Sequence, residues 1–403
     1  MRFIFMSEGE THPGHTHAQR YRELIDEVLL AEKVGFDAFG TSEQHLAIGT
    51  ATTSAPEVIF PYLMALTSRI QFIHLITLLP KKINHALRVA ERLATEDILS
   101  NGRVAVAFGR GNTTLALHAF EVDPKETRSQ QIEGIEVIRR AMAKDIFSFV
   151  GDHYKIPPRG LVPKHIQQPY PPMLMATGSP ESVVAAARMG IGAIMGGGYG
   201  GFGPLKKMVD LYEKELASAE HVWPVQAQKV AVISGGMHCA ETTEEAERWA
   251  STLADTVALS IDSYERLSKQ SSDYANMGKI KKVDFTNPRY LFDDSACFIV
   301  GDPKTCIAQV QRFVDIGIEA IAIRIDGLPH KEMMKSIELF GNYVIPAFKN
   351  PRAVVRRPDE ILADIRAARP AHYAEVEAHA KKTGEAAADA VMGESVRGTG
   401  ASA

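Results

Sequence analysis

The segment ALRVAERLATEDILSNGRVAVAFGRG, residues 86–111, contains the repeating unit from which the fold follows. Apolar side chains recur every three to four residues over 86–99, which predicts a helix with one buried face. A polar turn at 100–102 ends this helix, and the apolar run 104–108 then predicts a buried strand. A helix that leads through a short turn into a wholly apolar strand is typical of a parallel sheet covered by helices.

The same alternation extends along most of the chain. Strands are expected at residues 2–6, 36–41, 70–79, 104–108, 173–176, 193–195, 230–234 and 320–325. Helices are expected at residues 17–34, 56–67, 86–99, 127–143, 179–189, 205–217, 243–267, 305–316 and 331–344, with a hairpin over 147–156. Eight strand–helix alternations predict an α/β protein with a (β/α)8 TIM barrel, because a doubly wound open sheet rarely needs eight units.

Two segments fall outside this pattern. Residues 268–296 are polar and irregular, and they predict an insertion or lid before the last strand. Residues 351–403 are rich in Ala, Arg and Glu and fade into a small-residue tail, which predicts a helical appendage with a disordered end. We therefore expect residues 1–350 to form the barrel and 351–403 to form the appendage.

Composition excludes several classes of function. Lys and Arg total 45 against 49 Asp and Glu, a net charge of −4 without a basic block, so neither nucleic acid nor a membrane surface is an expected partner. No apolar run approaches the roughly 18 residues of a membrane span, and the apolar N-terminus is interrupted at residues 7–9. The three cysteines have no paired spacing. We expect a cytoplasmic enzyme without a zinc site or a disulfide framework.

The segment Gly178-Ser179-Pro180-Glu181-Ser182 has the strongest signal for a ligand. In a (β/α)8 barrel the reacting groups lie on loops after the carboxyl ends of the strands, and this segment follows the strand at 173–176. Ser179 is a natural N-cap, Pro180 suits the first turn, and Gly178 allows a ligand close to the backbone. The amides of such a helix start attract phosphate, although helix capping alone also explains the residues.

Arg110 is the second anion-binding candidate. It stands between Gly109 and Gly111 directly after the strand at 104–108. The glycines leave room for the guanidinium, which can bind a phosphate through two parallel hydrogen bonds. The alternative is a structural arginine that pairs with a carboxylate across the barrel mouth. Two such features on neighbouring strands favour a phosphate-bearing ligand.

Two other polar groups have competing explanations. His12, His15 and His17 lie on an expected loop with no nearby cysteine or acidic set, so lining of a substrate pocket is favoured over a metal site. Arg324 and Asp326 follow the last strand, where substrate contact and an internal ion pair are both possible and the ion pair is favoured.

Four segments, in this order, resemble the bacterial luciferase-like family of flavin-dependent monooxygenases. They are AEKVGFDAFGTSEQH (31–45), RVAERLATEDILSNGRVAVAFGRGN (88–112), FEVDPKETR (120–128) and QQPYPPMLMATGSPESVVAAARMGIGA (167–193). The resemblance runs through about residue 345. It implies a TIM barrel that binds FMN, usually reduced FMN delivered by a separate NAD(P)H-dependent flavin reductase, and a homodimer.

The resemblance also implies which residues hold the cofactor. The phosphate shell would comprise Arg110, Arg128, Gly178, Ser179 and Ser182. Local chemistry does not select Arg128, which a solvated arginine at a helix start would also explain. The family often has a non-prolyl cis peptide at the end of the third strand, beneath the flavin ring. Leu75-Ile76 occupies that place in this chain, with Thr77 next to it.

Two positions depart from the family pattern. Luciferases have a reactive-site histidine where this chain has Gln44 and a cysteine where it has Gly109, so light emission is not expected. His45, next to Gln44, is the candidate acid–base group, because an imidazole exchanges protons near neutral pH. The alternative is a packed histidine that is hydrogen-bonded to the neighbouring strand.

These observations together predict a flavin-dependent monooxygenase. It would use reduced FMN and O2 to oxygenate a small organic substrate, by hydroxylation or Baeyer–Villiger insertion, with Gln44 and His45 as catalytic residues and no metal. Three alternatives stay open: a deazaflavin-dependent dehydrogenase on the same scaffold, a non-catalytic flavin-binding relative, and a barrel enzyme that acts on a phosphorylated metabolite. The sequence does not reveal the substrate.

Overall fold

The unit predicted at residues 86–111 is present in the computed structural model. Helix α3 (Ala86–Leu99) connects strands β3 (Gln71–Leu78) and β4 (Val104–Gly109), which pair in parallel. The His85 side chain caps the start of α3 by accepting the Leu87 N–H. The turn after α3 uses left-handed backbone at Asn101 and Gly102, with φ of 57° and 80°.

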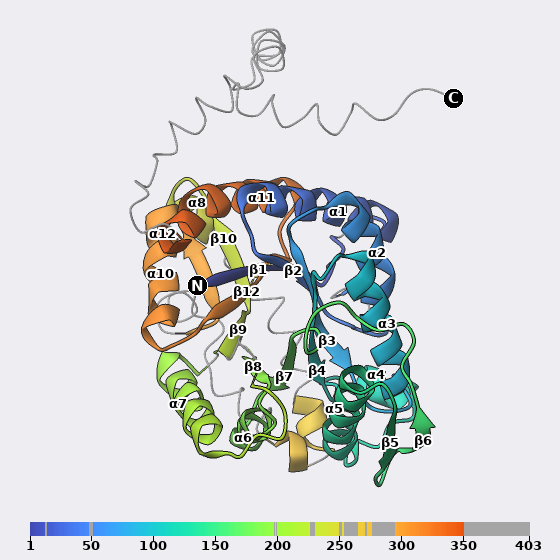
Figure 1. Ribbon diagram of the computed structural model, residues 1–403. Coiled ribbons are helices and arrows are strands. Elements are labelled where there is room, and N and C mark those ends of the chain that lie inside the picture. The colour runs from blue at the N-terminus through green and yellow to red at the C-terminus, as the bar shows by residue number, and fades with distance from the viewer. Residues whose placement is uncertain are drawn as a thin grey trace, which may run out of the picture. The chain divides into compact units, whose positions relative to one another are not determined.

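Eight parallel strands close into a barrel in the order β1, β12, β9, β8, β7, β4, β3, β2 (Figure 1). Besides β3 and β4 these are β1 (Arg2–Met6), β2 (Ala38–Thr41), β7 (Met173–Thr177), β8 (Gly192–Met195), β9 (Val230–Ser234) and β12 (Ala320–Arg324). The predicted TIM barrel is confirmed.

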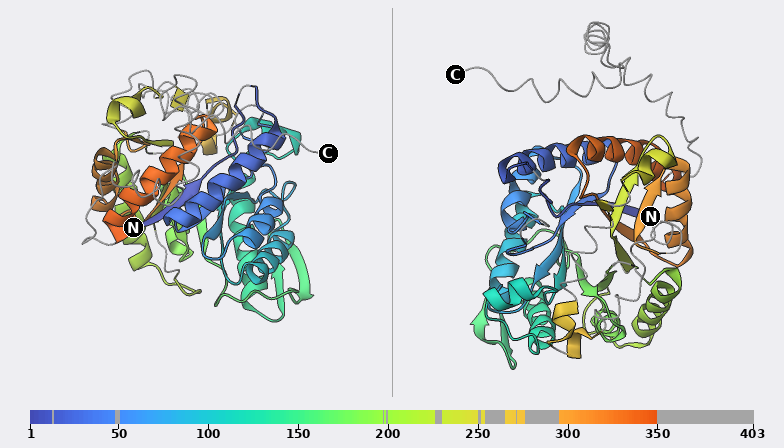
Figure 2. Two further views of the ribbon diagram at one scale, coloured as in Figure 1. Left: turned by 90° about the horizontal axis from the view of Figure 1, so that it is seen from above. Right: turned by 180° about the vertical axis from the view of Figure 1, so that it is seen from behind.

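Helices form a ring around the strands, as the view from behind shows (Figure 2, right). They are α1 (His17–Val34), α2 (Pro56–Leu66), α3, α5 (Thr127–Ala143), α6 (Pro180–Arg188), α7 (Phe202–Ser218), α10 (Pro303–Asp315) and α11 (His330–Leu339). The last of these continues into a π-helix (Phe340–Val344) and α12 (Ile345–Lys349).

Small and branched side chains fill the barrel interior. Alanines on several strands face larger residues such as Ile4, Met6, Ile73 and Leu75, so that layers of side chains interlock and leave no pore. The interior is therefore a packed core, and ligand chemistry is confined to the carboxyl ends of the strands.

Several short elements are absent from the sequence predictions. They are α4 (Thr114–Ala119) and a parallel pair of strands outside the barrel, β10 (Gly236–Cys239) and β11 (Phe298–Gly301). The predicted hairpin is present as β5 (Phe147–Val150) and β6 (Lys155–Arg159). Of the helix expected at 243–267, the described part includes α8 (Thr243–Glu247).

The structure describes residues 1–12, 14–47, 51–196, 198, 200–225, 230–249, 252–253, 265–270, 272–275 and 295–349. The chain divides into two units, 1–349 and 350–403. The predicted appendage and most of the predicted insertion at 268–296 lie outside the described residues, apart from a short 3-10 helix, Ser272–Tyr274. Among the described helices, none has the length and apolar character that a membrane span requires.

Candidate active site

Arg110 and Gly178 directly follow two neighbouring strands at the carboxyl end of the barrel. Strands β4 and β7 are neighbours, and Phe108 is paired with Met175, so the loops that follow both strands begin side by side. A Cβ atom added at Gly178 would meet no atom within 4 Å. The backbone at Gly178 therefore faces open space, as a position approached by a ligand requires.

The start of α6 is organised by two serines. Ser179 Oγ accepts the Ser182 N–H at 3.4 Å, and Ser182 Oγ accepts the N–H groups of Gly178 and Ser179 at 3.2 and 3.1 Å. The Ser182 hydroxyl donates in turn to the Ser179 carbonyl at 2.7 Å. These residues therefore cap the helix. In addition, the Ser182 hydroxyl oxygen accepts the N–H groups of both Gly178 and Ser179, so these two amides point toward one acceptor.

The two candidate arginines both lie between the end of β4 and the first turn of α5. The guanidinium of Arg110 lies 3.9 Å from the centre of the Tyr274 ring, which is a cation–π contact. Arg128 is the second residue of α5 and is half-buried. Both follow β4, one in the loop after the strand and the other at the start of α5.

The peptide between Leu75 and Ile76 is cis, which confirms the prediction for the end of β3. Two glycines on the flanking strands accommodate these side chains. A Cβ at Gly40 would lie 2.4 Å from Leu75 Cδ1, and one at Gly109 would lie 2.6 Å from Ile76 Cγ2. The departure from the family's cysteine at Gly109 therefore has a physical reason, because Ile76 fills the space that a side chain at 109 needs. Thr77 follows and is buried.

Changing Gly109 to alanine is expected to lower the free energy of unfolding by about 1–3 kcal/mol, the usual effect of overpacking. Urea unfolding would measure this. The double variant G109A/I76A should recover part of the loss, because Ile76→Ala removes the clashing methyl group. Gly178→Ala is the matched control and should change stability by less than about 0.5 kcal/mol. Equal stability of G109A and the wild type would show that the Ile76 contact is unimportant.

Glu43 fixes the end of β3, a role that the sequence predictions missed. Its carboxylate accepts the Leu78 N–H at 3.1 Å and the Asn84 amide at 2.7 Å, and its own N–H donates to the Ile76 carbonyl at 3.3 Å. A carboxylate directly after a barrel strand and beside Gln44-His45 is the signal that would have identified it.

His45 is held by the same carboxylate. Its Nε2 lies 2.8 Å from Glu43 Oε1, and its ring contacts Phe120 edge-on, with centroids 4.9 Å apart. The partner is thus a residue of the same segment and not of a neighbouring strand. When Glu43 accepts a hydrogen bond from Nε2–H, the neutral ring carries its lone pair on Nδ1, which is then the basic nitrogen.

Gln44 points toward the first strand. Its amide lies 3.5 Å from Glu8 Oε1, and Glu8 pairs with Arg324 at 3.0 Å. Arg324 also contacts Asp326 at 3.1 Å, which confirms the internal ion pair that the sequence favoured. Burial opposes the charge of Arg324, but the carboxylates of Glu8, Asp326 and Glu10 outweigh it and raise the pKa of this guanidinium.

The N-terminal histidines have separate partners. His12 Nε2 contacts the Leu328 carbonyl, and His15 Nδ1 lies 3.1 Å from Glu23. His17 is the first residue of α1. Within the described ranges, no three His, Cys, Asp or Glu side chains are grouped so that they could hold a metal ion.

Comparison with known proteins decides the family. A model described as luciferase-like monooxygenase matches residues 1–320. The chain belongs to the luciferase-like monooxygenase family. It is accordingly an enzyme of an oxidoreductase family, as the sequence predicted.

Relatives in this family use different cofactors. The chain is 29% identical to the uncharacterized protein y4wF of Sinorhizobium fredii over 44% of its length, and that match spans 51% of the relative. It is 23% identical to the F420-dependent glucose-6-phosphate dehydrogenase of Amycolatopsis mediterranei, over 81% of this chain and 95% of the other. It is 21% identical to the oxygenase component of the flavin-dependent trigonelline monooxygenase of Acinetobacter baylyi, over 87% and 97%.

Solved structures of luciferase-like enzymes share the fold. Monooxygenase RslO1 from Streptomyces bottropensis superposes with a TM-score of 0.71 at 22% identity, over 86% of this chain and 100% of the other. The oxygenating constituent of 3,6-diketocamphane monooxygenase from Pseudomonas putida, in complex with FMN, superposes with a TM-score of 0.68 at 17% identity, over 88% and 99%.

Proposed function

We propose that the protein is a flavin-dependent monooxygenase that uses reduced FMN and O2 to oxygenate a small organic substrate. The observation that supports FMN most directly is that Arg110 and the Gly178–Ser182 helix start follow neighbouring strands at the carboxyl end of the barrel. A phosphate monoester carries up to two negative charges, and guanidinium groups together with a helix start suit such a group.

The residues present fit this cofactor. Arg110, Arg128, Gly178, Ser179 and Ser182 would hold the phosphate through guanidinium groups, backbone amides and hydroxyl groups. Leu75, Ile76 and Thr77 would lie beneath the ring. Bound reduced flavin supplies the activation of oxygen, whereas the protein binds, orients and excludes water.

We assign the proton-handling role to His45 and a positioning role beside it to Gln44. Glu43 holds Nε2 of His45, so a proton would be accepted or given at Nδ1. Gln44 is oriented by Glu8, whose charge is balanced by Arg324. Hydroxylation and Baeyer–Villiger insertion are both compatible with this pair.

A separate NAD(P)H-dependent flavin reductase is the proposed partner. The trigonelline monooxygenase relative is named as an oxygenase component, which supports a two-component system. We further propose a cytoplasmic location, because NAD(P)H and reduced FMN are generated there.

A deazaflavin-dependent dehydrogenase is the second candidate, because the Amycolatopsis relative is F420-dependent. Anaerobic titration with reduced FMN, reduced riboflavin and reduced F420 separates the two. The FMN proposal predicts that reduced FMN binds best and that riboflavin, which lacks the phosphate, binds more weakly. Tight F420 binding, with substrate oxidation that persists without O2, would establish the dehydrogenase instead.

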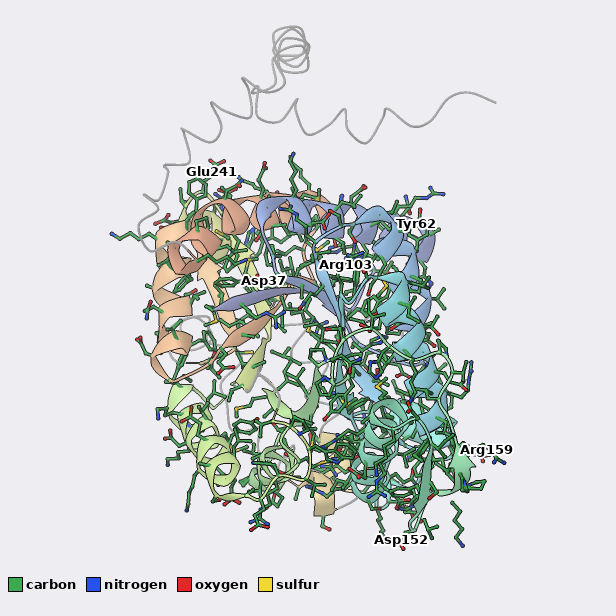
Figure 3. The ribbon with its side chains drawn as sticks, in the orientation of Figure 1. Asp37, Tyr62, Arg103, Asp152, Arg159 and Glu241 are labelled. Carbon is green, nitrogen blue, oxygen red and sulfur yellow. The ribbon has the colours of Figure 1, made fainter. Side chains whose placement is uncertain are left out.

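We propose a homodimer that forms through the outer face of α2. Val58, Tyr62 and Leu66 are 69%, 57% and 47% exposed and are four residues apart, so they form one apolar stripe. Tyr62 lies on the outer edge of the molecule (Figure 3). A second copy that presents the same stripe would cover it in a two-fold interface.

Tyr62→Asp is expected to convert the dimer to a 44.1 kDa monomer in light scattering coupled to size exclusion. A charge at the centre of an apolar interface is buried without a partner, which opposes association. Val150→Asp, on the exposed β5 strand, is the matched control and should stay dimeric. A wild type that is monomeric at micromolar concentration would refute the dimer.

A further inference from the structure

Tyr274 comes from the segment before the last strand, yet its side chain is wholly buried against the loop that follows β4. The Arg110 guanidinium lies 3.9 Å from the centre of its ring. Its hydroxyl lies 2.9 Å from Thr127 Oγ1 and 3.5 Å from the Arg110 carbonyl oxygen. Ring and hydroxyl thus contact two different parts of the segment that joins β4 to α5.

The Tyr274 hydroxyl belongs to a short chain of polar contacts at the start of α5. It shares a hydrogen bond with Thr127 Oγ1 in which either hydroxyl can donate, and the Thr127 hydroxyl also contacts the Pro124 carbonyl at 2.8 Å. Thr127 is the first residue of α5 and directly precedes Arg128. The hydroxyl therefore ties Tyr274 to the start of the helix that carries the second candidate arginine.

The ring contact fixes the plane of Arg110. A guanidinium is attracted through its flat face to the electron-rich face of an aromatic ring. Its N–H groups point outward in its own plane, so contact with the ring does not use them, and the same plane is the one in which a guanidinium forms two parallel hydrogen bonds to a phosphate. An arginine whose plane is set before the ligand arrives loses less side-chain freedom when it binds.

Apolar packing holds Tyr274 in place. The residue belongs to a buried cluster with Leu117, Val122 and Leu267, against which Phe120 packs. Phe120 in turn contacts the ring of His45. Phe120 therefore contacts both the cluster that holds Tyr274 and the ring of His45.

We propose that Tyr274 is a positioning residue of the cofactor-phosphate site, where its ring sets the guanidinium plane of Arg110. The proposal rests on the FMN site proposed above and adds a residue from the segment before the last strand. Tyr274 acts through Arg110, and its effect is therefore confined to ligands that carry a phosphate.

Reduced FMN and reduced riboflavin, which differ by the phosphate alone, are the probes for an anaerobic titration. Tyr274→Leu keeps an apolar side chain in the cluster but removes the ring, and it should weaken FMN binding about tenfold. Riboflavin binding should change less than twofold. Tyr274→Phe keeps the ring and should bind FMN within twofold of the wild type.

The Arg110→Ala variant tests whether Tyr274 acts through the arginine. If Tyr274 acts through Arg110, the double variant R110A/Y274L should bind FMN no more weakly than R110A. Thermal unfolding and circular dichroism confirm that each variant is folded. Tyr274→Met provides the same comparison if the leucine variant is unstable.

The outcomes separate the inference from the function on which it rests. If R110A lowers the FMN-to-riboflavin affinity ratio and Y274L does not, the role of Tyr274 is wrong and the FMN site stands. If R110A leaves that ratio unchanged, the phosphate site itself is wrong. A Y274F variant that loses as much as Y274L would assign the effect to the hydroxyl and overturn the role of the ring.

Discussion

Replacing Arg110 with alanine is expected to weaken the binding of reduced FMN by about 1.5–3 kcal/mol, or roughly tenfold to more than a hundredfold. Arg110 follows β4, and the start of α6 follows the neighbouring strand β7. A hydrogen bond between charged partners contributes free energy in this range. Anaerobic titration of the protein with reduced FMN, followed by the flavin spectrum, measures the change directly.

Two further variants test whether the loss is specific. Arg110→Lys keeps the charge but not the two parallel hydrogen bonds, so we expect it to bind FMN with intermediate affinity. Arg159, on the exposed β6 strand (Figure 3), is the matched control, and its alanine variant should bind FMN as the wild type does. Wild-type affinity in R110A would remove Arg110 from the cofactor site.

Replacing Asp326 with asparagine is expected to lower the free energy of unfolding by about 3–5 kcal/mol at neutral pH. The buried carboxylate accepts the Ser7 hydroxyl at 2.8 Å, the Glu8 N–H at 2.7 Å and Arg324 Nε at 3.1 Å, and Arg20 lies 3.9 Å away. Removing its charge leaves the buried guanidinium groups of Arg324 and Arg20 with less compensation. Urea unfolding of both proteins measures the difference.

This difference should depend on pH. Burial opposes the charged form of Asp326, but Arg324 and Arg20 outweigh it, so its pKa in the folded protein lies below the ordinary aspartate value. The unfolded chain therefore takes up the proton first as the pH falls. The stabilisation is complete above the ordinary value near 3.9 and is lost as the pH falls through the folded pKa.

The stability difference between the wild type and D326N should accordingly begin to shrink as the pH falls below about 4, and it should be lost only when the pH is below the folded pKa of Asp326. Asp210→Asn is the matched control, because Asp210 pairs with Lys206 on the exposed surface of α7 and should change stability by less than about 1 kcal/mol. A D326N variant as stable as the wild type at pH 7 would show that the buried network does not stabilise the fold.

Periodicity in the sequence located the long elements. Helices α1, α3 and α5 have the bounds that were predicted, because their apolar faces repeat over several turns. Strands β10 and β11 were missed, because each is four residues long and they pair only after long-range folding. The first of them contains Gly236, whose local signal is that of a turn.

The candidate site, too, could be predicted from the sequence only in part. The strand-end rule is enough to place Arg110 and the α6 start together, since it needs only the order of the strands. The sequence could not explain why position 109 is a glycine, because the explanation is the Ile76 side chain, which occupies the space beside it. Tyr274 lies 164 residues from Arg110, in a stretch of sequence without clear apolar periodicity, so no local pattern could have predicted their contact.

The reaction of bound reduced FMN with oxygen tests the proposed monooxygenase most directly. Protein in excess over reduced FMN would be mixed anaerobically, then with oxygenated buffer in a stopped-flow instrument, and the flavin spectrum followed. The proposal predicts that oxidised FMN forms far more slowly than in free solution, because the protein shields the reacting flavin from water. Formation of oxidised FMN at the rate seen without protein would contradict it.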